Sequence, residues 1–410
     1  MKVTAIRPPQ LRTTETEKER KAVTWTELFY DLVFVVAVAG LGSRLLEDPT
    51  IRGAAVFTAL FVPLWWAWVG FTFYADRYDT DDLGQRILAV AQMVTIALMA
   101  ASIAGDETQS FVGFALAYVA ARVILIVMYL RARRHVPETR ELVTGYVQGM
   151  TVAVAVWLIS VFVPEPFRYV LWAIGLLIDF YNVYRVRRIQ AKVPLDVAHL
   201  PERFGLFTIL VLGESIAAVV AGLRHEGWIA GPVVTAVLAV GVAAGLWWVY
   251  FDNLDGTVVR RRADQKKAWK PTVWIYGHLP LVIGLMVTAI GLEGAVIGAG
   301  GHDWPVNERW LLIAGVGGAL VGIGIIELAT ERADNAISRL KARWRVAGAL
   351  VSVVIGLLSA FVGALGTMIM LVLLMATQVG ADVWIDEKQA AGPTGVEASA
   401  NADGVDIQDG

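Results

Sequence analysis

The sequence contains no cysteine and carries little charge. None of its 410 residues is cysteine and only 18% are Asp, Glu, Lys or Arg, whereas about a quarter of the residues in an ordinary soluble domain are charged. The absence of cysteine excludes disulfides, thiolate metal sites and cysteine nucleophiles. The sequence also has no P-loop, no G-x-S-x-G elbow and no H-E-x-x-H zinc motif. We therefore expect a protein that is not an enzyme and that has no metal site and no cofactor.

Apolar residues, in contrast, are abundant and occur in long runs. Hydrophobic residues make up 57% of the sequence, and the mean hydropathy is +0.59. A helix that rises about 1.5 Å per residue needs roughly 20 apolar residues to cross about 30 Å of hydrocarbon. The runs are continuous and much longer than the roughly 10 residues of a barrel strand. Because backbone groups in lipid must be paired within the protein, the sequence predicts an all-α integral membrane protein.

The runs predict a polytopic bundle of about 12 transmembrane helices. The last two lie in one apolar stretch and meet at Gly363, and the number falls to 11 if that stretch is a single overlong helix. Residues 1–23 are polar and predict an N-terminal tail. The acidic residues 385–410 predict a disordered C-terminal tail. The expected spans are residues 25–46, 53–74, 86–104, 110–130, 143–163, 168–184, 204–223, 232–251, 274–298, 308–329, 346–362 and 364–382.

Basic residues gather in alternate loops and indicate the orientation of the chain in the membrane. Cytoplasmic loops are enriched in Lys and Arg, and the N-terminal tail falls on the basic side. We therefore expect a cytoplasmic N-terminus, and we expect no nucleic-acid binding by these loops. The basic loops are residues 131–134, 185–192, 260–267 and 339–343.

A short motif occurs twice and indicates a duplicated chain. The motif Tyr-x-Asp-x-x-Asp follows a Trp-rich helix in both places, and its first Asp is Asp76 in one copy and Asp252 in the other. This favours a 6+6 parallel repeat with halves at residues 24–190 and 191–384. The alternative is that two apolar helices resemble each other by chance.

Two acidic residues lie deep within expected spans. Asp31 is about two turns inside the first span and shares a helix face with Glu27. Glu214 lies twelve residues after Glu202, which is about 18 Å along the helix axis, beside Gly213, where another backbone could approach. A carboxylate at such a depth is costly unless it is paired, protonated or hydrated. We expect Asp31 and Glu214 to line a transport path, whereas Glu27 fits a helix cap better.

Further polar residues within the spans are candidate partners for these acids. We expect proton or charge partners at Arg122, Asp179 and His278, and Asp179 shares a helix face with Asn182. For His278, a hydrogen-bonded packing role stays open as the alternative. The cytoplasmic entrance is expected to hold Glu27, His199, Glu202, Arg203, Asp76 and Asp252.

The segments around these residues resemble the bacterial low temperature requirement A (LtrA) family. One segment is E-L-F-Y-D-L-V-F from Glu27, and the other is H-L-P-E-R-F-G-L-F-T-I-L-V-L-G-E-S from His199. His278 within Y-G-H-L-P fits the same pattern, and the likeness spans most of residues 24–380. The resemblance implies a multi-pass protein of the bacterial inner membrane that is associated by name with growth in the cold, and it implies no particular activity.

The ionisable residues within the spans favour a transporter or channel for a small ion or solute, because a purely structural bundle would avoid them. The expected partners are the lipid bilayer and that ion or solute, and an oligomer is left open. One alternative is a non-catalytic membrane sensor or partner protein linked to cold adaptation. The other is a membrane-embedded lipid-modifying enzyme, for which the sequence shows neither a nucleophile nor a metal set.

Overall fold

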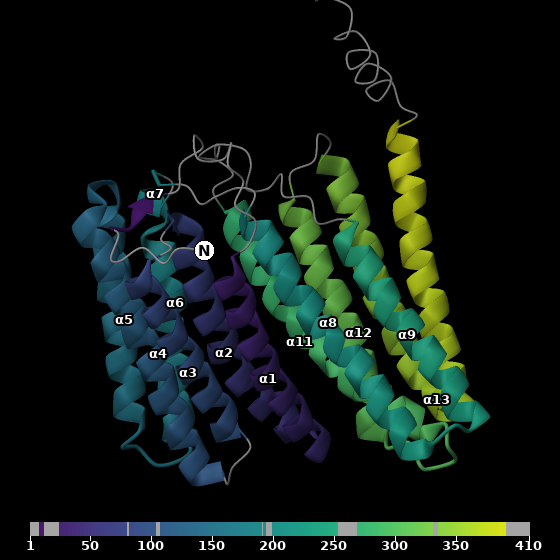
Figure 1. Cartoon of the computed structure of the whole chain (residues 1–410). Helices are drawn as coiled ribbons and strands as arrows, with labels where there is room; N and C mark the ends of the chain where they lie inside the picture. Colours follow the sequence, from purple (N-terminus) through teal and green to yellow (C-terminus); the bar gives the residue numbers. More distant parts are fainter. Residues whose placement is uncertain are drawn as a thin grey trace, which may run out of the picture. The chain divides into compact units, whose positions relative to one another are not determined.

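Almost all described residues of the computed structural model are helical (Figure 1). Among the described residues, the extended segments are two strands, β1 (Gln10–Leu11) and β2 (Tyr78–Asp79), which pair antiparallel. The expected all-α class is thereby confirmed. The structure describes residues 8–11, 24–79, 82–103, 107–190, 192–193, 199–252, 269–330 and 335–390.

The helices belong to two compact units. The first unit holds the described residues of Met1–Glu214 and Gly256–Pro271, and the second holds those of Ser215–Asp255 and Thr272–Gly410. The boundary falls within α8 (His199–Glu226), so this helix contributes to both units. The expected duplication of two six-helix halves stays a prediction.

Six long helices build most of the first unit. Helices α3 and α4, α4 and α5, and α5 and α6 pack as neighbouring pairs, and α1 packs against both α2 and α3. The core is rich in aromatic residues, since Trp65, Trp68 and Trp157 are fully buried. The helices of this unit are α1 (Trp25–Glu47), α2 (Ile51–Arg77), α3 (Leu83–Ile103), α4 (Glu107–His135), η2 (Pro137–Thr139), α5 (Arg140–Ser160), α6 (Phe167–Arg185) and α7 (Arg187–Gln190).

The second unit is built on four long helices and the C-terminal half of α8. They are α9 (Ala230–Phe251), α11 (Lys270–Gly298), α12 (Val306–Ala329) and α13 (Asn335–Ala390). Helix α13 packs against both α12 and α9. Small residues bring α11 and α12 together: a methyl group at Gly322 would lie 2.5 Å from the Leu281 backbone nitrogen, and one at Gly315 would lie 2.4 Å from that of Thr288. Such close approach is typical of helix pairs in membranes.

Replacing Gly322 by Ala is expected to lower the free energy of unfolding by about 1–3 kcal/mol, because the added methyl group forces α11 and α12 apart. Thermal unfolding in detergent, followed by tryptophan fluorescence, measures the change. The matched control is Gly380→Ala, since Gly380 has open space around it and a better helix former there gains up to about 1 kcal/mol. Equal melting temperatures for the two variants would contradict the packing described.

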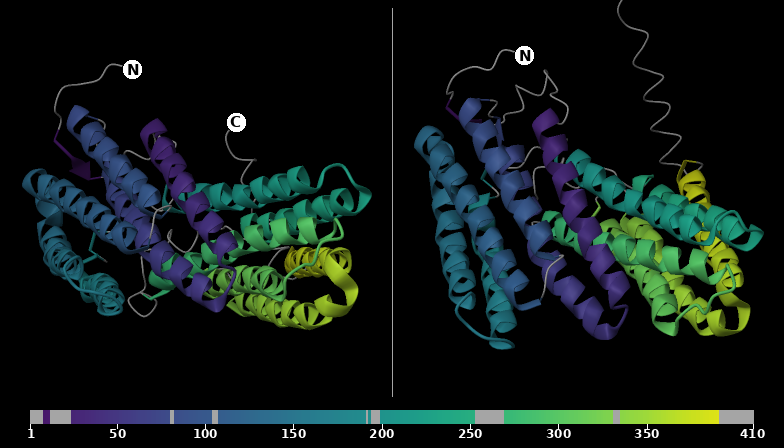
Figure 2. Two further views of the ribbon diagram at one scale, coloured as in Figure 1. Left: turned by 90° about the horizontal axis from the view of Figure 1, so that it is seen from below. Right: turned by 60° about the horizontal axis from the view of Figure 1, so that its bottom comes forward.

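Helix α13 is two helices joined at Gly363. The backbone there has φ 67° and ψ −170°, which interrupts the helix and is accessible to glycine without a steric penalty. The arms run side by side in both views of Figure 2. Across them, Arg345 donates to Gln378 and is paired with Asp382. The break expected at Gly363 is confirmed, and the overlong single helix is not formed.

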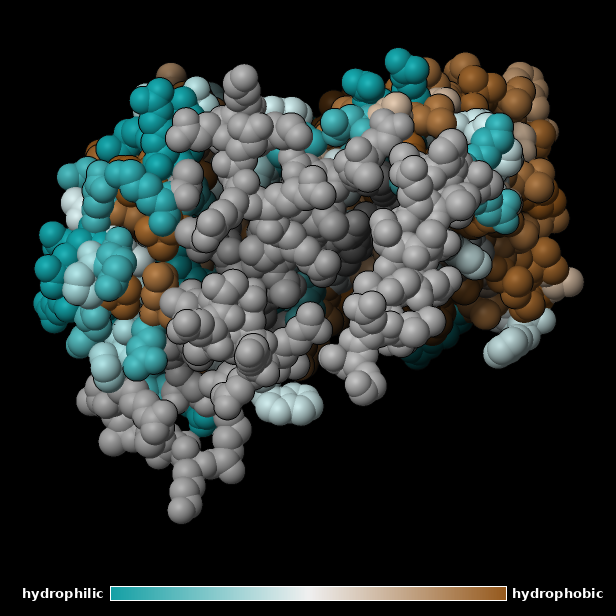
Figure 3. All heavy atoms as spheres, turned by 90° about the horizontal axis from the view of Figure 1, so that it is seen from above, coloured by the Kyte–Doolittle hydropathy of each residue, from teal (hydrophilic) through white to brown (hydrophobic). Residues whose placement is uncertain are grey.

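Among the described residues, ten helices are long and apolar enough to cross a membrane, counting α13 once. Helix α6 is less apolar because it carries Arg168, Asp179 and Arg185. Together with α6 and the second arm of α13, these ten helices account for the twelve expected segments. Helix α13 continues to Ala390, beyond the expected start of the C-terminal tail, and within this extension Asp386 pairs with Lys341. Apolar side chains cover much of the visible flank of the second unit in Figure 3.

Candidate functional site

Asp31 on α1 is bound by a buried arginine and a buried tryptophan. Its Oδ1 accepts hydrogen bonds from Nη2 of Arg203 and from Nε1 of Trp68, both at 2.8 Å. All three side chains are fully buried, and Arg203 also donates to the hydroxyl of Thr72 at 3.4 Å. The cluster therefore connects α1, α2 and the N-terminal part of α8 within the first unit.

Aromatic rings enclose this ion pair. The indole of Trp68 stacks on Phe207 at 4.3 Å between centroids, and Phe204 approaches it edge-on at 5.0 Å. The Arg203 guanidinium carbon lies 5.9 Å from the Trp68 ring. Because the ion pair is closed off by rings, the geometry suits a fixed link between three helices.

Sequence reasoning missed Arg203 as the partner of Asp31, for which Arg122, Asp179 and His278 were considered. Arg203 was assigned to the helix entrance, yet its side chain is buried. The sequence did contain an indication that Asp31 and Arg203 could pair. Asp31 lies six residues into α1 and Arg203 lies four residues into α8, so their depths are about 9 and 6 Å from helix ends expected on the same side.

A second buried ion pair joins α4 to α6. Nη2 of Arg122 lies 2.6 Å from Oδ1 of Asp179, and the Tyr118 hydroxyl donates to Oδ2 of Asp179 at 3.4 Å. Both charged side chains are at least 95% buried. An ion pair so far from water is held by charge-assisted hydrogen bonds, and its partners depend on each other for stability.

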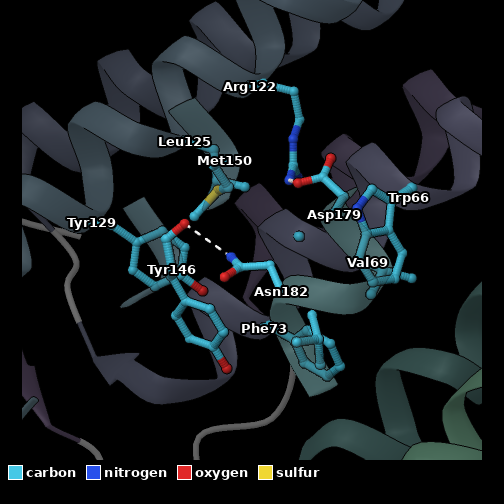
Figure 4. A pocket seen from close by; sticks show the side chains of 12 residues that line it. Trp66, Val69, Phe73, Arg122, Leu125, Tyr129, Tyr146, Met150, Asp179 and Asn182 are labelled. Atoms are coloured by element: carbon cyan, nitrogen blue, oxygen red, sulfur yellow. Dashed lines mark hydrogen bonds and ion pairs between the residues drawn. The ribbon is translucent and has the colours of Figure 1, made fainter. Parts of the chain in front are cut away.

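This pair borders a cavity of about 40 Å³ between α2, α4, α5 and α6. One water molecule needs about 10–15 Å³ of such cavity volume, so the cavity has room for about three waters or a small ion. Figure 4 shows Arg122, Asp179 and Asn182 around it, with Tyr129 and Tyr146 on another side. The lining residues are Trp66, Val69, Gly70, Phe73, Arg122, Leu125, Tyr129, Tyr146, Met150, Asp179, Asn182 and Val183.

The sequence placed Asp179 and Asn182 on one helix face, and both line this cavity. The Asn182 amide donates to the backbone oxygen of Tyr146 at 3.1 Å, and its oxygen accepts from Arg185 at 2.9 Å. The side chain fits because α5 has Gly149 at the contact, where a methyl group would lie 2.2 Å from the Asn182 amide nitrogen. The wall near Asn182 is therefore fixed in position.

His278 lies in the second unit and is fully buried. Its Nδ1 is 2.8 Å from the backbone oxygen of Trp274, and its Nε2 is 3.0 Å from the Tyr250 hydroxyl. Because a backbone carbonyl only accepts hydrogen bonds, Nδ1 carries a proton that it donates to Trp274, and Nε2 forms the hydrogen bond with the Tyr250 hydroxyl. Both ring nitrogens of His278 are thus engaged within the core, an arrangement of the kind that the packing alternative describes.

Glu214 is about half buried, and among the described residues its carboxylate has no hydrogen bond and no ion pair. No described atom lies within 4 Å of a methyl group placed at Gly213, so the close backbone approach expected there is absent. Within the first unit, the structure therefore does not bring Glu214 together with Arg122 or Asp179 in a hydrogen bond or an ion pair.

The entrance residues differ in their surroundings. Glu27 forms a capping box with Thr24, whose backbone nitrogen donates to the Glu27 carboxylate at 2.8 Å. Glu202 is exposed, and Asp252 is exposed and accepts from Trp248. Asp76 is buried. The side chain of His199 lies outside the described residues.

The sequence reasoning also missed the buried pair of Arg345 and Asp382 in the second unit. The two residues stand 18 and 19 positions on either side of Gly363. In two antiparallel arms joined at Gly363 they must therefore lie at the same height. That symmetry was available from the sequence once the break at Gly363 was assumed.

Long apolar helices with ion pairs buried between them define a multi-pass α-helical membrane protein. Comparison with known proteins gives the family: residues 22–379 match the family of the bacterial low temperature requirement A protein, LtrA. The chain therefore belongs to the LtrA family. It is similar to an uncharacterised protein of Rhizobium meliloti (strain 1021), with 29% identity over 322 residues, which cover 74% of this chain and 76% of that protein.

Proposed function

We propose that this LtrA-family protein is a transporter or channel for a small ion or solute and that the cavity beside Arg122 and Asp179 is its binding site. The observation that carries the proposal is a buried, charged pair at the wall of a cavity that can hold a small ligand. Ionisable residues within spans usually face such internal cavities. Neither residue of the Asp31–Arg203 pair lines that cavity, and the pair packs instead beside the rings of Trp68, Phe204 and Phe207.

The pair offers two kinds of binding group to a ligand. If a ligand carries a negative charge, it competes with Asp179 for the Arg122 guanidinium; a cation or a proton competes with Arg122 for the Asp179 carboxylate. Either event separates the partners and leaves the other residue in need of a new interaction. A bound ligand is thereby coupled to the packing of α4 against α6, which is a way to link binding to a conformational change.

The remaining assignments follow from this proposal. The LtrA family membership and the basic loops support a bacterial inner membrane location with a cytoplasmic N-terminus. We propose a carrier or channel and not an enzyme, since the sequence offers no recognisable nucleophile or metal set. The ligand is a small ion or solute, and the surrounding bilayer is the other partner.

Ion flux into liposomes that hold the purified protein tests the proposal. We expect flux above that of empty liposomes for at least one of sodium, potassium, protons, chloride, phosphate and acetate. Asp179→Asn and Arg122→Gln are each expected to reduce that flux to background, because each leaves a buried polar partner unpaired at the cavity wall.

The matched control is Glu138→Gln, which neutralises an exposed carboxylate away from the cavity lining and the expected entrance and should leave the flux unchanged. Gel filtration before reconstitution identifies variants that fail to fold. The absence of flux for the whole panel would count against transport and favour a sensor or partner protein. Flux that survives both cavity substitutions would place the path elsewhere.

A further inference from the structure

Arg77, the last residue of α2, is a buried arginine that pairs with no carboxylate among the described residues. Its side chain is 1% exposed, and within the described part of the chain none of its three guanidinium nitrogens has a hydrogen-bond acceptor. Arg122, Arg203 and Arg345 are equally buried, and each of them is paired with an aspartate. Arg77 is thus an exception to the pattern that the rest of the structure follows.

Tyr146 lies over this arginine, and three further tyrosines continue from Tyr146 through ring contacts. The Arg77 guanidinium carbon lies 5.7 Å from the ring centre of Tyr146. Tyr129 lies 5.5 Å from Tyr146 and 5.2 Å from Tyr74, and Tyr74 lies 5.0 Å from Tyr78, measured between ring centres. We call these four residues, Tyr74, Tyr78, Tyr129 and Tyr146, the tyrosine cage. Their phenols carry no charge to balance the guanidinium, and the buried Tyr74 hydroxyl has no hydrogen-bond partner among the described residues.

A buried, unpaired charge costs several kcal/mol, which a bound counter-charge would offset. Arginine and phenol hydroxyls together suit an oxyanion, because the guanidinium donates two parallel hydrogen bonds and each hydroxyl can donate one more. The cage is also continuous with the cavity, since Tyr129 and Tyr146 belong to both.

We propose that Arg77 and the tyrosine cage bind a small oxyanion, such as phosphate or a short carboxylate, and that this anion is the solute that enters the cavity beside Arg122. The inference rests on the proposed function and adds the charge and chemical class of the ligand. Arg122 and Arg77 would then belong to two successive binding sites for the anion. Gly70 lies against Arg122, and Arg77 follows seven residues later on the same helix, about 10 Å along its axis.

Thermal unfolding in detergent, at constant ionic strength set with sodium chloride, tests this inference. We expect sodium phosphate or sodium acetate to raise the melting temperature of the wild type saturably, since a ligand that binds the folded state stabilises it. Arg77→Met should abolish the rise. Arg77→Lys should weaken the apparent affinity about ten- to a hundredfold, because a point charge replaces the guanidinium fork.

The matched control is Arg133→Met, which removes an exposed arginine and should keep the full anion-dependent rise. No rise in the wild type would overturn the inference, whether or not the variants fold. A rise caused by dioctanoyl phosphatidic acid and by neither free anion would also overturn it, because the ligand would then be a lipid headgroup.

Liposome flux separates this inference from the proposed function. Flux of phosphate or acetate that Arg77→Met abolishes supports both. Flux of cations alone that Arg77→Met does not change would support the proposed transport function. It would contradict the inference that the transported ligand is an anion. No flux for any ion would remove the proposed function, while an anion-dependent rise in melting temperature would still establish the Arg77 site.

Discussion

Replacing Arg203 by Met is expected to lower the free energy of unfolding by about 3–5 kcal/mol, because it leaves the Asp31 carboxylate charged and buried without its cation. Asp31→Asn is expected to lower the free energy of unfolding by a similar amount, because it leaves the Arg203 guanidinium buried without its carboxylate. Trp68 can still donate to the side-chain oxygen of Asn at position 31, so that hydrogen bond is retained. Unfolding by titration with sodium dodecyl sulfate measures both changes.

The double variant Asp31→Asn with Arg203→Met tests whether the costs of the two single substitutions arise from the same ion pair. It removes both charges, so its cost should fall below the sum of the single costs by about 2–3 kcal/mol. Asp252→Asn serves as the control, since that carboxylate is exposed and its loss should change stability by less than about 0.5 kcal/mol. Additive costs, or single costs below about 1 kcal/mol, would contradict a buried and mutually dependent pair.

Replacing Gly70 by Leu is expected to reduce transport to the level of empty liposomes although neither residue of the charged pair is replaced. Even a methyl group at this position would lie 2.8 Å from Cδ2 of Leu125 and 3.0 Å from Nη1 of Arg122. The larger side chain must therefore extend into the cavity of about 40 Å³. Flux of whichever ion the wild type carries measures the effect.

Gly40→Leu controls for the addition of a large side chain to a spanning helix, because nothing lies within 4 Å of a methyl group at Gly40. We expect wild-type flux for this variant. If Gly70→Leu folds, as judged by gel filtration and melting temperature, and still transports at the wild-type rate, the cavity is not on the path.

The helices were predictable from the sequence because bilayer thickness sets their length. Each apolar run near 20 residues became a helix, and the break at Gly363 was predictable as a glycine near the middle of a run too long for one span. The common face of Asp179 and Asn182 followed from helical periodicity alone. These features depend on neighbours in the sequence and need no knowledge of how helices pack.

The partners of the buried charges were less accessible to sequence reasoning. Pairing depends on which helices are adjacent and on how each is rotated, and neither quantity is local. Glu214 shows the limit: its depth follows from the rise per residue, but the structure leaves its carboxylate half buried and unpaired among the described residues. The cavity beside Arg122 requires four helices to be placed together, so no single segment predicts it.

Cysteine accessibility is the most direct test of the claim that this cavity carries the ligand. The chain has no cysteine, so Val183→Cys introduces a single thiol at the cavity wall, and Glu138→Cys introduces one at an exposed position away from it. Both variants are reconstituted, treated with a small charged methanethiosulfonate, and assayed for flux. We expect modification to block flux through Val183→Cys and to leave Glu138→Cys at its untreated rate. Complete labelling of Val183→Cys with no loss of flux would contradict the account.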